Sequence, residues 1–366
     1  MLNGLKPLSR SLRWGMVGGG GTSQIGYSHR CAALRDNVYT LLAGALDVDA
    51  ERGRAFGEQL GIAPERCYAD YQTLFREEAQ RPDGIEVVSV TTPNNTHFAI
   101  TKAALEAGKH VVVDKPFTVT LSQACELESL AKHCGRVLSV FHNRRWDSDF
   151  LTVRALINEG QLGEVCYFES HFDRFRPQVR QRWREQGGPG SGIWYDLGPH
   201  LLDQAVVLFG LPVSITVDLA QLRPGAQSTD YFHAVLAYPQ RRVVLHGTLL
   251  AAAESARFIV HGSRASYIKF GLDPQEERLK NGERLPQEDW GYDMRDGTLT
   301  RAEGDERSEE TWLTLPGNYP AYYAAIRDAL NGEGENPVPA SEAIQIMTLI
   351  ELGIESARHR ATLSLV

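Results

Sequence analysis

Two residues suited to acid–base chemistry, Asp196 and His200, are four positions apart. On a continuous helical turn, residues with this spacing share a face. A histidine held by a carboxylate can take up or release a proton near neutral pH. The structural alternative is that Asp196 caps a helix and His200 packs in the core. No metal site is predicted here, because companion His and Cys ligands are missing from the motif.

A lysine, Lys115, follows an apolar strand predicted over residues 110–113, with Asp114 before it and Pro116 after it. In open α/β sheets the carboxyl ends of the strands border the ligand crevice. An ammonium group at that edge could polarise a carbonyl or donate a proton. The alternative is a solvated surface lysine, which the rigid and apolar neighbours disfavour.

A polar loop follows the strand predicted over residues 85–91 and should lie at the same edge. Pro93 fixes the turn, while Asn94 and His97 offer polar groups to a cofactor ribose. His97 could instead simply begin the next helix. The loop residues proposed to bind a cofactor are Thr92, Pro93, Asn94 and His97.

Four glycines, residues 18–21, stand between the first predicted strand and a helix. Glycines there let the backbone approach a pyrophosphate, whose charge then meets the helix N-terminus. The G-x-G-x-x-G fingerprint is incomplete, because Ser23 occupies the third position and Gly26 follows three residues later. A plain glycine turn is the alternative. The residues predicted to bind the cofactor here are Gly18, Gly20, Ser23, Gln24 and Ile25.

An acidic residue, Asp47, ends the second predicted strand about 20 residues after Gly26, where a ribose-binding acid belongs. Its carboxylate would accept from the adenosine ribose hydroxyls and repel a 2′-phosphate, which favours NAD over NADP. Asp47 or Asp49 could also cap the next helix. Arg52 and Arg54 keep NADP as the alternative cofactor.

Alternating strand and helix patterns occupy residues 1–145 and predict a doubly wound parallel sheet, a Rossmann domain. Residues 146–366 carry long Val-, Phe-, Tyr- and Thr-rich runs, which predict an α+β domain with an open, mostly antiparallel sheet. The charged stretch 273–310 is interpreted as an exposed excursion. Helices are predicted over 319–330 and 341–358.

Composition excludes several classes of protein. The 366 residues include 38 Lys+Arg and 46 Asp+Glu, a net charge of −8, which argues against a nucleic-acid partner. The five cysteines form no CxxC pair, and neither a signal peptide nor a run of membrane-spanning length is evident. We therefore expect a cytoplasmic protein without a nucleic-acid or membrane partner.

The glycine loop, Thr-Pro-Asn-x-x-His, Asp-Lys-Pro and Asp-x-x-x-His, in this order, resemble the glucose-fructose oxidoreductase/inositol dehydrogenase (Gfo/Idh/MocA) family. The resemblance implies that Lys115, Asp196 and His200 are the catalytic triad of a nicotinamide-dependent dehydrogenase acting on sugars or cyclitols. Asp114 departs from the commoner Glu of the motif. The cofactor-binding residues are also expected to include Arg52, Asp114 and Lys115. The candidates for contacting substrate hydroxyls are Asn143, Arg145, Trp146, Arg174, Arg176, Tyr195 and Asp203, although the arginines could instead form interdomain ion pairs.

Two other functions occur in the family, NAD-dependent glycosidases and non-catalytic NAD(P)-binding regulators, and both stay open as alternatives. The resemblance also implies homodimers or homotetramers and a last helix that returns to the Rossmann domain. From about residue 92 onward the chain resembles the branch with NADP-dependent scyllo-inositol dehydrogenases. The first 90 residues resemble another branch, so the chain is interpreted as a hybrid.

Overall fold

The computed structural model describes residues 11–21, 23–281 and 290–365. The chain divides into two compact units. The first comprises Met1–Asn143, Gln275–Trp290 and Asn318–Ile344, and the second comprises Arg144–Pro274, Gly291–Gly317 and Gln345–Val366. Two segments late in the sequence, residues 275–290 and 318–344, thus belong to the first unit. The two predicted domains, residues 1–145 and 146–366, are each continuous in sequence, and this division remains a prediction.

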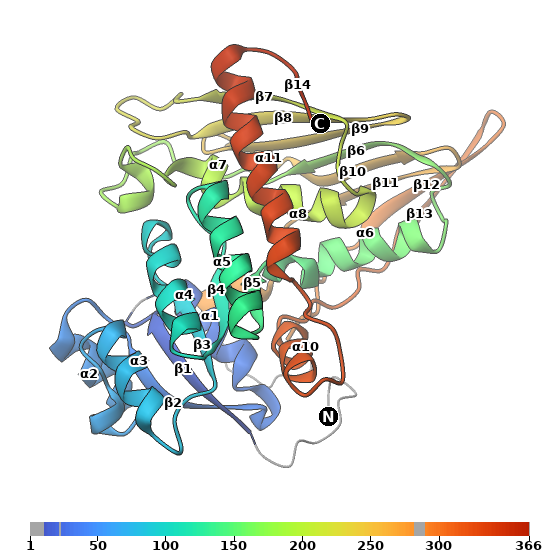
Figure 1. Ribbon diagram of the computed structural model, residues 1–366. Helices are drawn as coiled ribbons and strands as arrows, with labels where there is room; N and C mark the ends of the chain where they lie inside the picture. Colours follow the sequence, from blue (N-terminus) through green and yellow to red (C-terminus); the bar gives the residue numbers. More distant parts are fainter. Residues whose placement is uncertain (1–10, 22, 282–289, 366) are drawn as a thin grey trace. The chain divides into compact units, whose positions relative to one another are not determined.

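The first unit contains a five-stranded parallel sheet in the order β2-β1-β3-β4-β5 (Figure 1). Its central strands β3 and β4 are runs of valine buried on both faces, as expected for a parallel sheet covered by helices. The predicted Rossmann architecture is confirmed. The strands are β1 (Leu12–Gly18), β2 (Tyr39–Ala45), β3 (Val87–Thr91), β4 (His110–Asp114) and β5 (Leu138–Phe141).

Helices connect these strands, and side chains that cap their N-termini define where several begin. Ser23, Asp49, Asp70 and Thr120 each accept a hydrogen bond from a backbone N–H of the first turn. The helix after Asp70 was not predicted. The helices are α1 (Gln24–Ala33), α2 (Ala50–Gln59), α3 (Tyr71–Gln80), α4 (His97–Glu106) and α5 (Leu121–Cys134).

The returning segments supply α9 (Gln275–Lys280) and α10 (Pro320–Leu330), and both contact α1. Tyr323 on α10 is fully buried in an aromatic cluster with Trp14, Tyr39 and Phe141. These rings meet mostly edge to face or tilted, the arrangements that aromatic quadrupoles favour. A segment distant in sequence therefore completes the core of the first unit.

The second unit is built on a nine-stranded sheet in the order β13-β12-β11-β10-β6-β9-β8-β7-β14. All neighbouring strands are antiparallel except β6 and β9, so the predicted mostly antiparallel sheet is confirmed. The strands are β6 (Val165–His171), β7 (Ser214–Ala220), β8 (Tyr231–Tyr238), β9 (Arg241–Thr248), β10 (Ala256–Gly262), β11 (Ala265–Phe270), β12 (Gly297–Glu303), β13 (Glu306–Trp312) and β14 (Leu363–Ser364).

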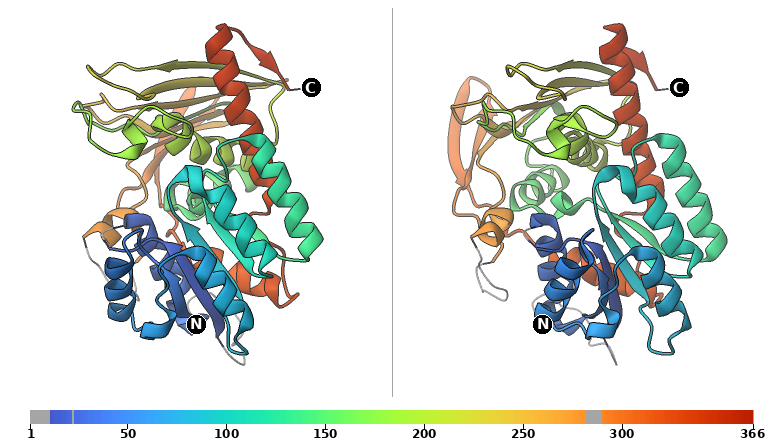
Figure 2. Two further views of the ribbon diagram at one scale, coloured as in Figure 1. Left: turned by 60° about the vertical axis from the view of Figure 1, so that its left-hand side comes forward. Right: turned by 90° about the vertical axis from the view of Figure 1, so that its left-hand side faces the viewer.

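One face of this sheet packs against helices (Figures 1 and 2). Residues alternate along each strand, and β8 places Phe232, Ala234 and Leu236 in the core while the residues between them face outward. Among the described residues, no helix covers the outward face, which we call the open face. The helices of this unit are α6 (Ser148–Asn158), α7 (Gly192–Asp196), α8 (Gly198–Phe209) and most of α11 (Ala340–His359).

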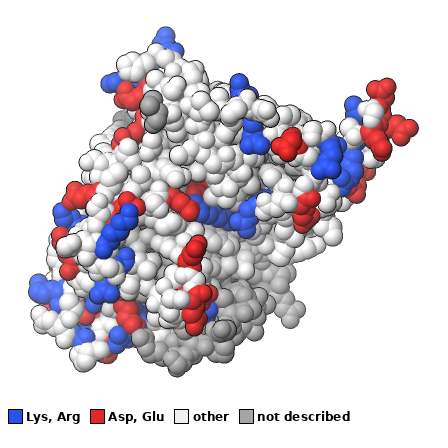
Figure 3. Space-filling model, turned by 45° about the vertical axis from the view of Figure 1, so that its right-hand side comes forward, with Lys and Arg blue, Asp and Glu red and all other residues white. Residues whose placement is uncertain are grey.

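The stretch 273–310 is not the exposed excursion that its charge suggested. Asp293 is buried and pairs with the buried Lys269 at 3.0 Å, and β12 and β13 extend the sheet. Among the described residues of this stretch, β13 is exposed along nearly its whole length, and Figure 3 shows acidic side chains gathered on a projecting part of the surface. The prediction failed because paired charges can be buried, and because a polar edge strand shows no apolar alternation. Within the described residues, no helix is long and apolar enough to cross a membrane.

Candidate cofactor and catalytic site

The glycine turn after β1 has the backbone conformation that only glycine adopts easily. Gly18 and Gly19 have φ angles of +78° and +74°. A Cβ on Gly20 would lie 2.4 Å from the carbonyl oxygen of Leu46, so a side chain there would collide with the end of the neighbouring strand. The turn leads to the N-terminus of α1, where Ser23 accepts from the Gly26 N–H at 3.3 Å. Backbone N–H groups in this arrangement suit a pyrophosphate.

Gly26 has a role that its position in the sequence did not reveal. A Cβ on this residue would lie 2.2 Å from the Gly19 carbonyl oxygen, so α1 packs directly on the glycine turn. Close packing of the helix on the strand end is the function of the third fingerprint glycine, which Ser23 cannot supply. Arg30 was also missed, and its Nη1 donates to the Gly19 carbonyl at 2.6 Å.

Asp47 follows β2 at the same sheet edge, and its carboxylate is about one quarter exposed. Arg52 Nη2 lies 2.9 Å from Asp47 Oδ1, and the Asp49 N–H also donates to this oxygen. These hydrogen bonds lower the pKa of Asp47. Asp49, and not Asp47, caps α2 by accepting from the Arg52 N–H at 2.9 Å. The Asp47 carboxylate therefore accepts hydrogen bonds and forms an ion pair with Arg52.

The loop after β3 is held by His97 at the start of α4. The ring is fully buried, with Nδ1 2.9 Å from the Pro116 carbonyl and Nε2 2.9 Å from the Thr92 carbonyl. Burial lowers the pKa of His97. Because both ring nitrogens face protein carbonyls, His97 joins the loops that follow β3 and β4. Asn94 is buried in the short turn Asn94–Thr96 between Pro93 and α4.

Asp114 ends β4 and Lys115 follows it, and both are buried. Asp114 Oδ1 lies 3.8 Å from His29 Nε2, and neither atom has a hydrogen-bond partner among the described residues. Burial would raise the pKa of Asp114, but the nearby His29 and Lys115 lower it. A buried, charged oxygen without a donor is costly in isolation. Together with the glycine turn, this oxygen makes the sheet edge fit for a polar cofactor.

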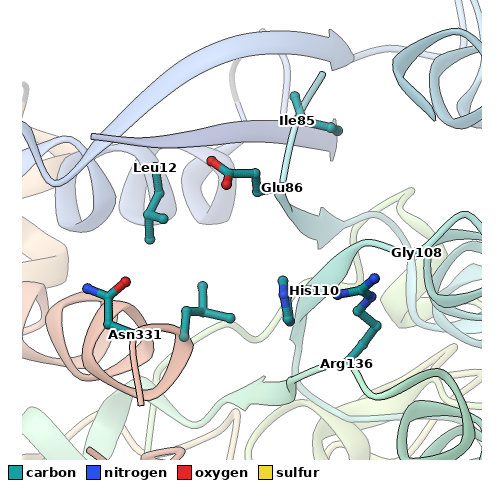
Figure 4. A pocket seen from close by; sticks show the side chains of 8 residues that line it. Leu12, Ile85, Glu86, Gly108, His110, Arg136 and Asn331 are labelled. Atoms are coloured by element: carbon teal, nitrogen blue, oxygen red, sulfur yellow. The ribbon is translucent and has the colours of Figure 1, made fainter. Parts of the chain in front are cut away.

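A pocket of about 300 Å³ lies at the opposite, amino-terminal edge of the same sheet (Figure 4). It opens beside the first residues of β1 and β4, far from the glycine turn along the strands. It is therefore separate from the predicted cofactor edge. Its lining residues are Leu12, Ile85, Glu86, Gly108, His110, Arg136, Leu330 and Asn331.

In the second unit, two predicted substrate residues contact each other. Arg145 donates to Asp203 through Nε at 2.8 Å and through Nη2 at 2.6 Å, and both side chains are buried. This bidentate pair lies within one unit, so it is not the interdomain ion pair considered from the sequence. Asp203 is three residues after His200 on α8, which places both on one helix face. Asn143 and Trp146 bound the short turn Asn143–Trp146 that leads to α6.

Asp196 and His200 lie on two helices, and the continuous turn expected between them is absent. Asp196 ends α7, Leu197 separates the helices, and His200 lies buried in the first turn of α8. Gly198 and Pro199 between them start a new helix. Asp196 has two arginines nearby, with Arg174 Nη1 at 3.9 Å and Arg184 Nε at 3.7 Å. Arg184 was not predicted.

Two further substrate candidates have shifted ionisation. Burial lowers the pKa of Arg176 to about 10, and the positive charges of Arg174, Arg180 and Arg182 contribute. Burial and then Glu351 raise the pKa of Tyr195 to about 12. The arginines gathered near Asp196 favour anionic or hydroxyl-rich ligands, because guanidinium groups donate several hydrogen bonds.

The fold and these features define a two-part α/β oxidoreductase. The family description "Oxidoreductase family, NAD-binding Rossmann fold" matches residues 12–142, and "Oxidoreductase family, C-terminal alpha/beta domain" matches residues 154–365. The chain belongs to the Gfo/Idh/MocA family. It is an enzyme of the NAD(P)-dependent oxidoreductase class, and its nicotinamide cofactor is bound by the Rossmann domain.

Three relatives connect the chain to known proteins. The uncharacterized oxidoreductase YdgJ of Escherichia coli is 83% identical over 281 residues, covering 77% of this chain and 81% of YdgJ. The scyllo-inositol 2-dehydrogenase (NADP(+)) IolW of Bacillus subtilis is 39% identical over 304 residues, covering 82% and 85%. An inositol dehydrogenase homolog from Azotobacter vinelandii, solved with NADH and myo-inositol, is 30% identical with a TM-score of 0.82, covering 99% of this chain and 100% of the homolog.

Proposed function

We propose that this protein moves a hydride between a CH–OH group of a cyclitol or sugar and NAD, with NADP as the alternative cofactor. The observation that carries the proposal is the position of Lys115. It follows β4 at the same sheet edge where the glycine turn follows β1, with only β3 between the two strands. A lysine beside a dinucleotide cradle is positioned to bind the oxygen of the group that reacts.

The substrate class is supported by the relatives and by the polar residues of the second unit. IolW is named for scyllo-inositol, and the Azotobacter homolog was solved with myo-inositol. Arg145 forms a rigid donor and acceptor pair with Asp203, which lies on the helix face that carries His200. Fixed pairs of this kind can discriminate between ring hydroxyls, because a mismatched hydroxyl leaves a buried polar group unsatisfied.

In this proposal Lys115, Asp196 and His200 act on one substrate hydroxyl. His200 takes the hydroxyl proton, Lys115 hydrogen-bonds the oxygen and stabilises its negative charge, and Asp196 orients His200 or the substrate. When bound, the nicotinamide supplies the hydride acceptor. The residues of this chain position the carbon and move the proton.

The test follows NAD(P)H formation with a panel of inositols and aldoses, and NAD(P)H consumption with their oxidised forms, using each cofactor. Lys115→Ala and His200→Ala should each lower kcat by roughly 10²–10⁴ in a folded protein, the range for a lost acid–base group. Lys132→Ala is a matched control, since Lys132 is an exposed lysine on α5. Near-normal turnover in either variant would refute the assigned role.

The same panel separates the dehydrogenase from the other functions known in the family. Net NAD(P)H formation is expected of a dehydrogenase. Release of a sugar leaving group without net NAD(P)H would identify a glycosidase. Cofactor binding without turnover of any substrate would identify a regulator.

We also propose that the protein acts in the cytoplasm as a homodimer or homotetramer that pairs through the open face. The outward side chains of β8, and His246 and Thr248 of β9, are only partly exposed along this face. Light scattering after size-exclusion chromatography gives the mass in solution. A monomer of 40.7 kDa at micromolar concentration would refute this part.

A further inference from the structure

Three histidines form a row across adjacent strands on the open face. The strand register places His171 on β6 opposite His246 on β9, and His246 opposite His233 on β8. Asp218 on β7 continues the row opposite His233. Because neighbouring strands are about 4.8 Å apart, side chains that point to the same face from these positions are within reach of one another.

Asp173 connects two of these histidines two residues beyond the end of β6. Its Oδ2 lies 3.1 Å from His171 Nδ1, and its Oδ1 lies 2.9 Å from His246 Nδ1. One ligand atom from each of the three residues lies within 4.8 Å of the others. Asp173 is itself mostly buried and accepts from the Thr248 N–H, which fixes its carboxylate in place.

A second layer of hydrogen bonds orients His171. Its Nε2 lies 2.6 Å from Glu169 Oε1, and Tyr167 donates to the other oxygen of Glu169. A carboxylate that accepts from one nitrogen of a histidine leaves the other nitrogen, here Nδ1, for a different partner. Metal-binding histidines are usually held in this manner.

The electrostatics of the cluster favour a bound cation. Burial would raise the pKa of Asp173, but hydrogen bonds from His171, His246 and Ser255 lower it. Burial would lower the pKa of His171, but the carboxylates of Asp173 and Glu169 raise it. The carboxylates of Asp173 and Glu169 both lie against the His171 ring, so negative charge is concentrated where a cation would bind.

We propose that His171, Asp173 and His246 bind a divalent transition-metal ion such as Zn²⁺ on the open face, with His233 next to His246 as the candidate fourth ligand. Two imidazoles and one carboxylate suit Zn²⁺, Co²⁺ or Ni²⁺, whereas Mg²⁺ and Ca²⁺ require mostly oxygen ligands. The metal would connect β6 with β9, and through His233 also with β8. The site is separate from the residues proposed for hydride transfer.

The test is a Co²⁺ titration of tag-free, chelator-treated protein, followed by ligand-field absorption, with Zn²⁺ as the competitor. We expect one Co²⁺ per chain, displacement by Zn²⁺, and affinity that rises with pH because histidine ligands bind metals in their neutral form. Asp173→Asn and His246→Gln should each weaken Co²⁺ binding at least about tenfold. Glu169→Gln should weaken it about 10- to 100-fold without removing a ligand.

His359→Gln is the matched control, since His359 is an exposed histidine near the end of α11. It should leave Co²⁺ binding unchanged, and circular dichroism should confirm that each variant is folded. The proposal is overturned if wild type shows no saturable Co²⁺ binding, or if binding survives unchanged in the ligand variants. If those variants do not fold, unchanged affinity in Glu169→Gln overturns it instead.

Discussion

The charge of Asp47 predicts that the enzyme prefers NAD to NADP, and Asp47→Ser should remove the preference. Serine keeps a hydrogen-bonding hydroxyl but carries no charge. In the wild type, the carboxylate accepts from the ribose hydroxyls of NAD, a hydrogen bond to a charged group worth about 1.5–3 kcal/mol. With NADP the same carboxylate faces a 2′-phosphate.

The size of the preference follows from the exposure of Asp47 and its pairing with Arg52. The Asp47 carboxylate is about one quarter exposed and its partner Arg52 about two thirds exposed, so water screens the pair. Two unit charges about 4 Å apart repel by about 1 kcal/mol in water, and the 2′-phosphate carries nearly two charges. Arg52, 2.9 Å from Asp47, offsets part of this repulsion. A net preference near 1.4 kcal/mol, or about tenfold in kcat/KM, is therefore expected.

The assay compares kcat/KM for NAD and NADP in wild type, Asp47→Ser and Asp49→Ser. Asp49→Ser is the matched control, because it removes an equal charge two residues away while serine still caps α2. The ratio should shift toward NADP at least about tenfold in Asp47→Ser and much less in Asp49→Ser. A wild type that prefers NADP would refute the assignment, and an unchanged ratio in Asp47→Ser would show that its carboxylate does not face the ribose.

Three further predictions concern packing and charge. Gly26→Ala should raise the KM for NAD and lower the unfolding free energy by about 1–3 kcal/mol, because the new Cβ would displace α1 from the glycine turn. An unchanged KM in a folded variant would contradict this prediction. Asp203→Ala should lower the unfolding free energy, measured by denaturant titration, by about 3–5 kcal/mol, because Arg145 stays buried without its carboxylate partner. A loss below about 1 kcal/mol would show that the pair is not buried in solution. His110 Nδ1 accepts from the Val137 N–H at 2.9 Å, and burial and then Arg136 lower the pKa of His110 to about 4. The unfolded chain therefore binds the proton more readily between about pH 6.5 and 4, so stability should fall by roughly 1–2 kcal/mol as pH drops through this range, and His110→Asn should flatten that slope.

The sequence predicted most strands and helices because their apolar periodicity is local. The predictions of secondary structure and exposure were wrong where the local sequence pattern was weak or where tertiary contacts overrode it. The helix Tyr71–Gln80 was missed despite the cap at Asp70, since its apolar positions are few. The charged stretch 273–310 was misinterpreted because Asp293 is buried only through its pairing with Lys269.

The sequence by itself determined which residues end the parallel strands, and hence that the glycine turn, Asp47, Thr92 and Lys115 share one sheet edge. That conclusion needs only strand direction, which the strand–helix alternation establishes. Only the tertiary structure revealed the packing of Gly26 on Gly19, the pairing of Arg145 with Asp203 across 58 residues, and the contact of Asp173 with His246 across 73. These depend on helix packing and strand register, and a shift of one residue in register would send His246 to the other face of the sheet.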